Sequence, residues 1–152
     1  NNNGRLDLGI STLPMATGIF NFNNLGTSTL GFVFNGNYTL PYTSFANLHI
    51  GGAGIKTLGG NTTLTNFTAS SNASLELSTF DLTINGTTLS LANTNFLFSK
   101  TGSGSLVFGG LLTTGFKGSA IFALTGNPSI EFRGGFTIDG RNNDNFGSSD
   151  FN

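Results

Sequence analysis

The chain has 152 residues and a formal net charge of −1, and only 9% of its residues are charged, against roughly a quarter in ordinary globular domains. So few basic side chains exclude an electrostatic surface for nucleic acid, and the absence of cysteine excludes disulfides and thiolate metal sites. Hydrophobic residues make up 37% of the chain and no apolar run could span a bilayer, so we expect one folded domain that does not insert into a membrane.

The first half of the chain consists of short apolar segments separated by Gly, Asn and Pro. Residues 1–31 contain alternating segments at 6–8 and 19–22. Four more segments follow, at 32–34, 48–50, 55–58 and 64–67. Short alternating runs between turn-forming residues predict β-strands. No window of helical length carries an apolar stripe at 3.6-residue spacing, so we expect essentially no helix.

Residues 75–98 repeat an apolar triplet every seven residues, beginning at Leu75, Leu82, Leu89 and Phe96. In an extended strand the first and third side chains of a triplet point to the same face. With the next triplet included, this alternation predicts the following core: Leu75, Leu77, Leu82, Ile84, Leu89, Leu91, Phe96, Phe98, Leu106 and Phe108. Seven residues from one strand to the next is too short for a hairpin and suits a solenoid with three sides and about 21 residues per coil. There we expect Phe to stack on Phe and corner Asn side chains to form ladders.

Further triplets at 106–108, 130–132 and 136–138 continue this pattern. We therefore predict an all-β fold: a parallel β-solenoid (β-helix) of short strands that forms a single domain over residues 1–138. Residues 139–152, rich in Asn, Asp, Gly and Ser, are predicted to be a polar cap or linker. An antiparallel β-sandwich stays open as an alternative, because it also needs turns at short regular intervals.

A longer motif occupies residues 36–64. Residues 38–41 (Tyr-Thr-Leu-Pro) are followed by 45–50 (Phe-Ala-Asn-Leu-His-Ile) and by 52–61 (Gly-Ala-Gly-Ile-Lys-Thr-Leu-Gly-Gly-Asn). This order resembles a repeat of very large secreted surface proteins of Bacteroidota, over about residues 32–110. The resemblance implies a β-solenoid stalk or passenger that is exported to the cell surface, often by type IX secretion, and that acts in adhesion, gliding or biofilm matrix. It supplies no catalytic residues.

Few side chains indicate chemistry. His49, the single histidine, alternates with Leu48 and Ile50, so we expect it on the outer surface, and one His without Cys does not make a zinc site. A carbohydrate-active β-helix needs two carboxylates on one face, for which Glu76 and Asp81 are the nearest candidates. The loop at 139–145 lacks the spacing of a calcium loop. We therefore predict no enzyme, no catalytic or metal residue and no cofactor.

Tyr38 and Tyr42 flank Pro41 and are the candidate carbohydrate contacts. Asn-x-Ser/Thr sequons occur at about the frequency that chance predicts for this composition, so they do not indicate glycosylation.

The function we expect is a structural or adhesive module of an exported, extracellular cell-surface protein. Its partners would be neighbouring copies or domains of that protein and surface polysaccharide. One alternative is an all-β subunit of an extracellular filament or pilus that assembles by strand exchange, and another is a carbohydrate-active β-helix. Because the chain begins at Asn1 without Met, we expect either a removed leader or a fragment of a longer protein.

Overall fold

A computed structural model describes residues 4–9, 27–40, 44–70, 72–90, 97–114 and 122–138. These residues form fifteen strands and no helix, as the sequence predicts. The strands are β1 (Arg5–Leu8), β2 (Thr29–Phe32), β3 (Tyr38–Leu40), β4 (Ser44–Ile50), β5 (Gly54–Leu58), β6 (Thr62–Ala69), β7 (Ala73–Glu76), β8 (Leu82–Ile84), β9 (Thr88–Ser90), β10 (Leu97–Lys100), β11 (Ser105–Phe108), β12 (Leu112–Thr114), β13 (Phe122–Leu124), β14 (Ser129–Phe132) and β15 (Phe136–Ile138).

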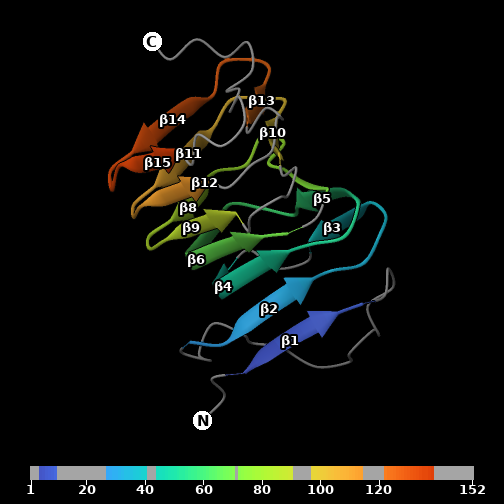
Figure 1. The fold of residues 1–152 in the computed structure, drawn as a ribbon. Helices are drawn as coiled ribbons and strands as arrows, with labels where there is room; N and C mark the ends of the chain where they lie inside the picture. The colour runs from blue at the N-terminus through green and yellow to red at the C-terminus, as the bar shows by residue number, and fades with distance from the viewer. Residues whose placement is uncertain are drawn as a thin grey trace.

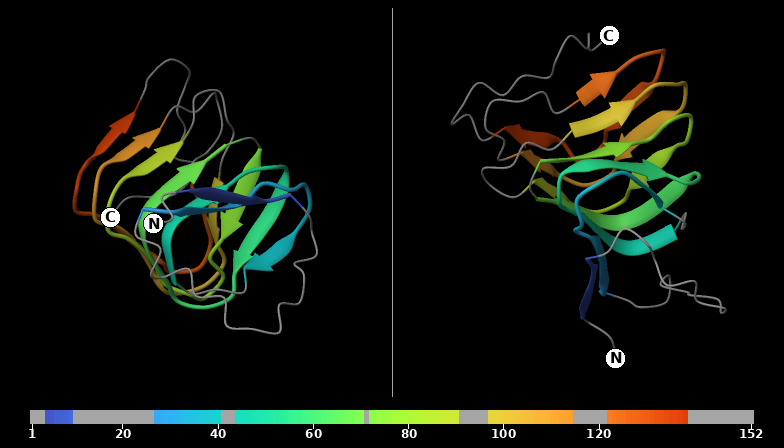
Figure 2. Two further views of the ribbon diagram at one scale, coloured as in Figure 1. Left: turned by 90° about the horizontal axis from the view of Figure 1, so that it is seen from below. Right: turned by 90° about the vertical axis from the view of Figure 1, so that its right-hand side faces the viewer.

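Every pairing between these strands is parallel, and the coils stack from β1 at one end to β14 and β15 at the other (Figure 1). Figure 2 shows the same stack from below and from its side. The strands form a ten-stranded and a five-stranded sheet. The predicted parallel β-solenoid is therefore confirmed, and the antiparallel sandwich is excluded.

The stack has three sides. The first side consists of the N-terminal halves of β4 and β6, then β8, β11 and β14. The second side consists of β1, β2, the C-terminal halves of β4 and β6, then β9, β12 and β15. The third side is the five-stranded sheet of β3, β5, β7, β10 and β13. Because β4 and β6 bend from the first side to the second, these two sides share one sheet.

The seven-residue rhythm corresponds to three consecutive sides of one coil. Its triplets fall on β7, β8 and β9, and β10 then pairs with β7. Leu75 pairs with Phe98. This coil is therefore slightly longer than the coil of about 21 residues that three such sides predict. The three-sided coil is confirmed, while the expected coil length is slightly short.

The coils lengthen along the chain. On the second side Thr29 pairs with Asn47, Phe67 pairs with Thr88, and Leu112 pairs with Phe136, so the interval between partners grows from the early coils to the late ones. Phenylalanine rings of successive coils stack in the later part of the chain. The rings of Phe98 and Phe122 stack at 5.8 Å, and those of Phe108 and Phe132 stack at 5.2 Å between centroids. The expected stacking of Phe on Phe is confirmed.

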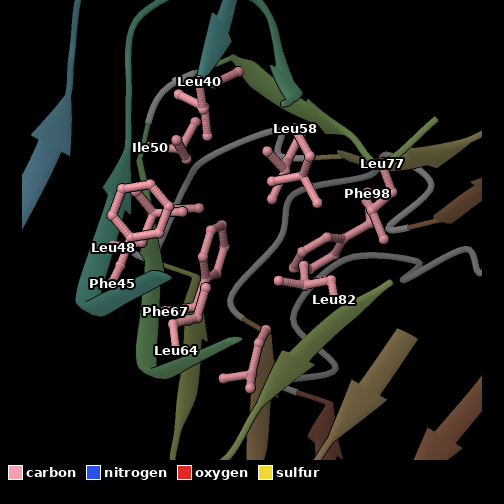
Figure 3. Close-up of a cluster of buried hydrophobic side chains, with 14 of the residues drawn as sticks. Leu40, Phe45, Leu48, Ile50, Leu58, Leu64, Phe67, Leu77, Leu82 and Phe98 are labelled. Atoms are coloured by element: carbon pink, nitrogen blue, oxygen red, sulfur yellow. The ribbon is translucent and has the colours of Figure 1, made fainter. Parts of the chain in front are cut away.

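The core is continuous through the stack (Figure 3). Of the predicted core residues, seven are buried: Leu75, Leu77, Leu82, Ile84, Phe98, Leu106 and Phe108. Leu91 and Phe96 lie outside the described residues, and so does the side chain of Leu89. The inward position on β9 belongs to Thr88, which is buried in register between Phe67 and Leu112. The last described strand, β15, ends at Ile138, so the predicted cap or linker at 139–152 lies outside the described residues.

Candidate functional site

An asparagine ladder runs along the bend between the first and second sides. Asn66 Nδ2 donates to Asn47 Oδ1 at 2.7 Å, and Asn47 Nδ2 donates to the Ser28 carbonyl at 2.9 Å. The backbone N–H of Thr87 then donates to Asn66 Oδ1 at 2.9 Å. The ladder thus connects successive coils where the strands bend, which confirms the expected laddering of corner asparagines.

Other corners use the same device. A side-chain oxygen of one coil accepts a backbone N–H of the next coil. Asn35 accepts from Ala53, Asn37 from Ile55, Asn61 from Asp81, and Asp81 from Ser105. These bonds replace the sheet ladder where it is interrupted, so corner N–H groups remain satisfied. Asn37, Asn61 and Asn66, which stand in sequons, therefore have a structural role of their own.

A hollow of about 320 Å³ lies beside the asparagine ladder. Its lining comes from three neighbouring coils: Thr27, Thr29, Asn47, Leu48, Thr65, Asn66 and Thr68. The bends of β4 and β6 produce it, because each bend places two residues between inward side chains. In β6 these are Thr65 and Asn66, between buried Leu64 and Phe67. We call this feature the Thr–Asn hollow.

His49 alternates with buried Leu48 and Ile50, but it is only 2% exposed, so the expectation of a surface residue is wrong. Its Nδ1 lies 2.8 Å from Thr68 Oγ1, and its Nε2 lies 3.0 Å from Ser70 Oγ. Burial lowers the pKa of His49 below its ordinary value, and nearby Arg5 lowers it further while Asp7 opposes this. A serine beside a histidine is part of a catalytic triad, but here the other ring nitrogen faces a threonine rather than a carboxylate.

Two lysines that the sequence analysis did not single out are completely buried. Lys56 Nζ donates to the carbonyls of Phe34 at 2.7 Å and of Gly36 and Ala53 at 3.2 Å, and it lies 5.0 Å from the centroid of the Phe34 ring. These carbonyls belong to corners of two successive coils. The available signal was position: Lys56 has the same strand parity as buried Leu58.

Lys100 makes the equivalent contact at another corner, where its Nζ donates to the carbonyls of Phe80 at 2.6 Å and Ser78 at 3.3 Å. Burial lowers the pKa of both Lys56 and Lys100, and for Lys100 the carboxylates of Asp81 and Glu76 oppose this shift. Both lysines thus fasten one coil to the next.

The two candidate catalytic carboxylates have separate partners. Glu76 accepts the Ser78 N–H at 2.7 Å and the hydroxyl of Ser99. Asp81 accepts the N–H and the hydroxyl of Ser105 at 2.7 and 3.1 Å, and these bonds lower the pKa of Asp81. Within the described ranges, no three His, Cys, Asp or Glu side chains are grouped so that they could hold a metal ion.

Tyr38, a candidate carbohydrate contact, is half-buried. Its ring packs on the core, 6.0 Å from the ring of Phe32 and 5.4 Å from that of Phe34. The other candidate carbohydrate contact, Tyr42, lies outside the described residues. The carbohydrate contact at Tyr38 and Tyr42 therefore stays a prediction, and the Thr–Asn hollow was not found from the sequence.

Comparisons of the chain with protein-family models, curated proteins and solved structures gave no match. The described residues contain no helix with the length and apolar character of a membrane span. The stacked strands define the class of fold as a three-sided parallel β-solenoid.

Proposed function

We propose that the chain is a non-enzymatic structural and adhesive module of an exported cell-surface protein. The observation that carries this proposal is the uninterrupted parallel stack, in which each coil packs only on its neighbours. Such a stack grows in length without changing its cross-section or needing a new core. It therefore serves well to extend and present a surface. Export to the outside of the cell, by a type IX route, rests on the resemblance of residues 36–64 to Bacteroidota surface repeats.

The hydrogen bonds of the buried polar side chains also support a structural role. The buried polar groups that would be expected at a reactive centre, His49, Lys56 and Lys100, all bond to groups of neighbouring coils. Asp81 likewise bonds to the next coil through Ser105. Each of these groups contributes to holding the stack together, which is what a load-transmitting stalk requires.

Antibody labelling of the source cells tests the location, and adhesion of beads coated with the purified chain tests the role. We expect intact cells to be labelled and coated beads to adhere to cells or to surface polysaccharide more than beads coated with albumin. Labelling that requires permeabilised cells would overturn the exported location. Beads that adhere no better than the albumin control would overturn the adhesive role.

End-to-end assembly into a filament is a second candidate, favoured by the two ends of one interior column. Leu6 on β1 and Phe136 on β15 both face inward in register with the core but are 45% and 52% exposed. Another copy stacked on either end would cover them. Sedimentation over a range of concentrations tests this, with Leu6→Asp expected to abolish any oligomer. A wild-type chain that sediments as a monomer at all concentrations would count against assembly.

A further inference from the structure

We infer that the Thr–Asn hollow is a binding site for a neutral saccharide. This inference rests on the proposed adhesive function and assigns to it a site and a class of ligand. The hollow has a volume of about 320 Å³, at the lower end of the range of about 300–1,000 Å³ for small-molecule sites. That size suits the end of a glycan or a short oligosaccharide.

The lining of the hollow excludes strongly charged ligands. Among the described residues that line it, none is Asp, Glu, Lys, Arg or His. Their surface combines threonine methyl groups and Leu48 with hydroxyls and amides. Arg5, in register with Thr29 on β1, is already paired with Asp7 at 2.7 Å. An anionic ligand would therefore lose its hydration without gaining a free basic partner, and a cation would lose it without a free carboxylate. An apolar ligand would leave the amides and hydroxyls without partners. A neutral molecule rich in hydroxyl groups is the class that matches this lining.

The hydrogen-bonding groups of the hollow are held in fixed positions. Asn66 donates one amide N–H to Asn47, and Asn47 donates one to Ser28, so each amide has a second N–H outside these bonds. Within the described residues, the hydroxyls of Thr29 and Thr65 make no hydrogen bond. A threonine hydroxyl both donates and accepts, as a sugar hydroxyl does. The ladder thus orients the amides before a ligand arrives, which lowers the entropy cost of binding.

The spacing of the strands also suits a saccharide. Thr29, Asn47 and Asn66 stand in register on β2, β4 and β6, and neighbouring strands are about 4.8 Å apart. This repeat presents polar groups at separations comparable to those between substituents of a sugar ring. Because none of the described residues that line the hollow is aromatic, we expect weak binding at one site, with Kd on the order of 1 mM. Useful adhesion would then depend on several copies acting together.

The test uses the whole chain and a panel of neutral oligosaccharides, together with uronic-acid oligosaccharides as the charged comparison. The double variant Thr29→Val, Thr65→Val removes two hydroxyls from the hollow and keeps β-branched side chains that suit strands. Its matched control is Thr39→Val, Thr57→Val, which makes the same change at paired outward positions of β3 and β5 on the third side. We expect the hollow variant to bind a neutral saccharide at least about tenfold more weakly than wild type and the control to bind equally well.

A second measurement does not depend on how the variants fold. In two-dimensional NMR of the wild-type chain, the neutral saccharide should shift the amide signals of Thr29, Asn47 and Thr65 and leave those of Thr39 and Thr57 unchanged. The inference is overturned if no neutral saccharide binds, if the uronic-acid oligosaccharides bind equally well, or if the shifts fall on the third side. If beads coated with the hollow variant adhere as well as wild type, the adhesive function stands and the site assignment fails. If wild-type beads do not adhere at all, the adhesive function itself fails.

Discussion

The substitution Lys56→Met tests whether a buried ammonium fastens two coils together. Methionine keeps a long unbranched side chain and fills a similar space, so the change mainly removes the charge. It also removes the donor to the Phe34, Gly36 and Ala53 carbonyls, which are 2.7, 3.2 and 3.2 Å from Nζ. We expect the variant to fold but to be less stable.

The magnitude follows from which carbonyls can regain water. Gly36 and Ala53 are exposed corner residues, and Gly52, whose carbonyl lies 3.4 Å from Nζ, is half-buried, whereas Phe34 is only 5% exposed. One buried acceptor is therefore left without a partner, which costs about 1–3 kcal/mol. Loss of the cation–π contact with Phe34 adds to this, while relief from burying a charge offsets part of it. A net loss of about 1–3 kcal/mol corresponds to a fall in Tm of about 2–12 °C for a chain of this length.

Urea unfolding followed by circular dichroism at neutral pH measures this loss. Ile55→Met is the matched control, because Ile55 precedes Lys56 on β5 and is 43% exposed. We expect the control to change stability by less than about 0.5 kcal/mol. A Lys56→Met chain that equals or exceeds wild type in stability would show that the ammonium contributes nothing net, and the coil-fastening role would be wrong.

Four further changes follow from the core, the corners and the buried histidine. Leu82→Asp places an unpaired charge at a fully buried position, so we expect a loss of more than about 3 kcal/mol and of the β-sheet circular dichroism signal. Thr88→Val should raise the urea midpoint by the equivalent of about 1 kcal/mol, because within the described residues the buried Thr88 hydroxyl has no partner; an unchanged midpoint would show that the hydroxyl is satisfied. Gly110→Ala should lower stability by about 1–3 kcal/mol, since its Cβ would overlap the backbone of Gly86. Burial lowers the pKa of His49 below 6.5, so the unfolded chain takes up the proton first and stability should fall as the pH drops below about 6.5; the variant His49→Gln should lose this part of the pH dependence.

The three-sided coil could be predicted because its signal is local. Each side contributes one apolar-x-apolar triplet, and strand alternation then determines which side chains enter the core. The coil length could not be obtained in the same way. The connections between sides differ in length along the chain, and the triplets do not record that length. The later coils are accordingly longer than the early ones, as the pairing of Thr29 with Asn47 and of Leu112 with Phe136 shows.

The burial of Thr88 on β9 has a specific cause. Leu64 of β6 pairs with Ile84 of β8, and Phe67 of β6 pairs with Thr88 of β9. The segment from Ile84 to Thr88 is longer by a single residue than the segment from Leu64 to Phe67, so a residue is inserted between β8 and β9. Because strand side chains alternate with a period of two, this insertion exchanges inward and outward positions. Thr88 therefore takes an inward position on β9.

The buried lysine was missed for a different reason. Its parity with Leu58 placed Lys56 inside, but a lysine is almost never fully buried unless it is paired. Its partners are corner carbonyls, and that of Phe34 lies 22 residues away along the chain. Only the register of neighbouring coils brings them together, and no local pattern contains that register.

The inserted residue also explains why the Thr–Asn hollow is confined to the early coils. At the bend, the place of Thr65 and Asn66 is taken in the next coil by Asn85, Gly86 and Thr87. A Cβ on Gly86 would overlap both the Thr65 carbonyl and Asn66 Oδ1. Gly110 and Gly134 then stack on Gly86 in the two following coils, each so close to the previous one that a side chain would not fit. The corner thus changes from side chains that can bind a ligand to bare backbone that packs tightly. Gly86, Gly110 and Gly134 recur at equal intervals in the sequence. This recurrence identifies the coils in which glycine replaces the Thr and Asn side chains of the bend.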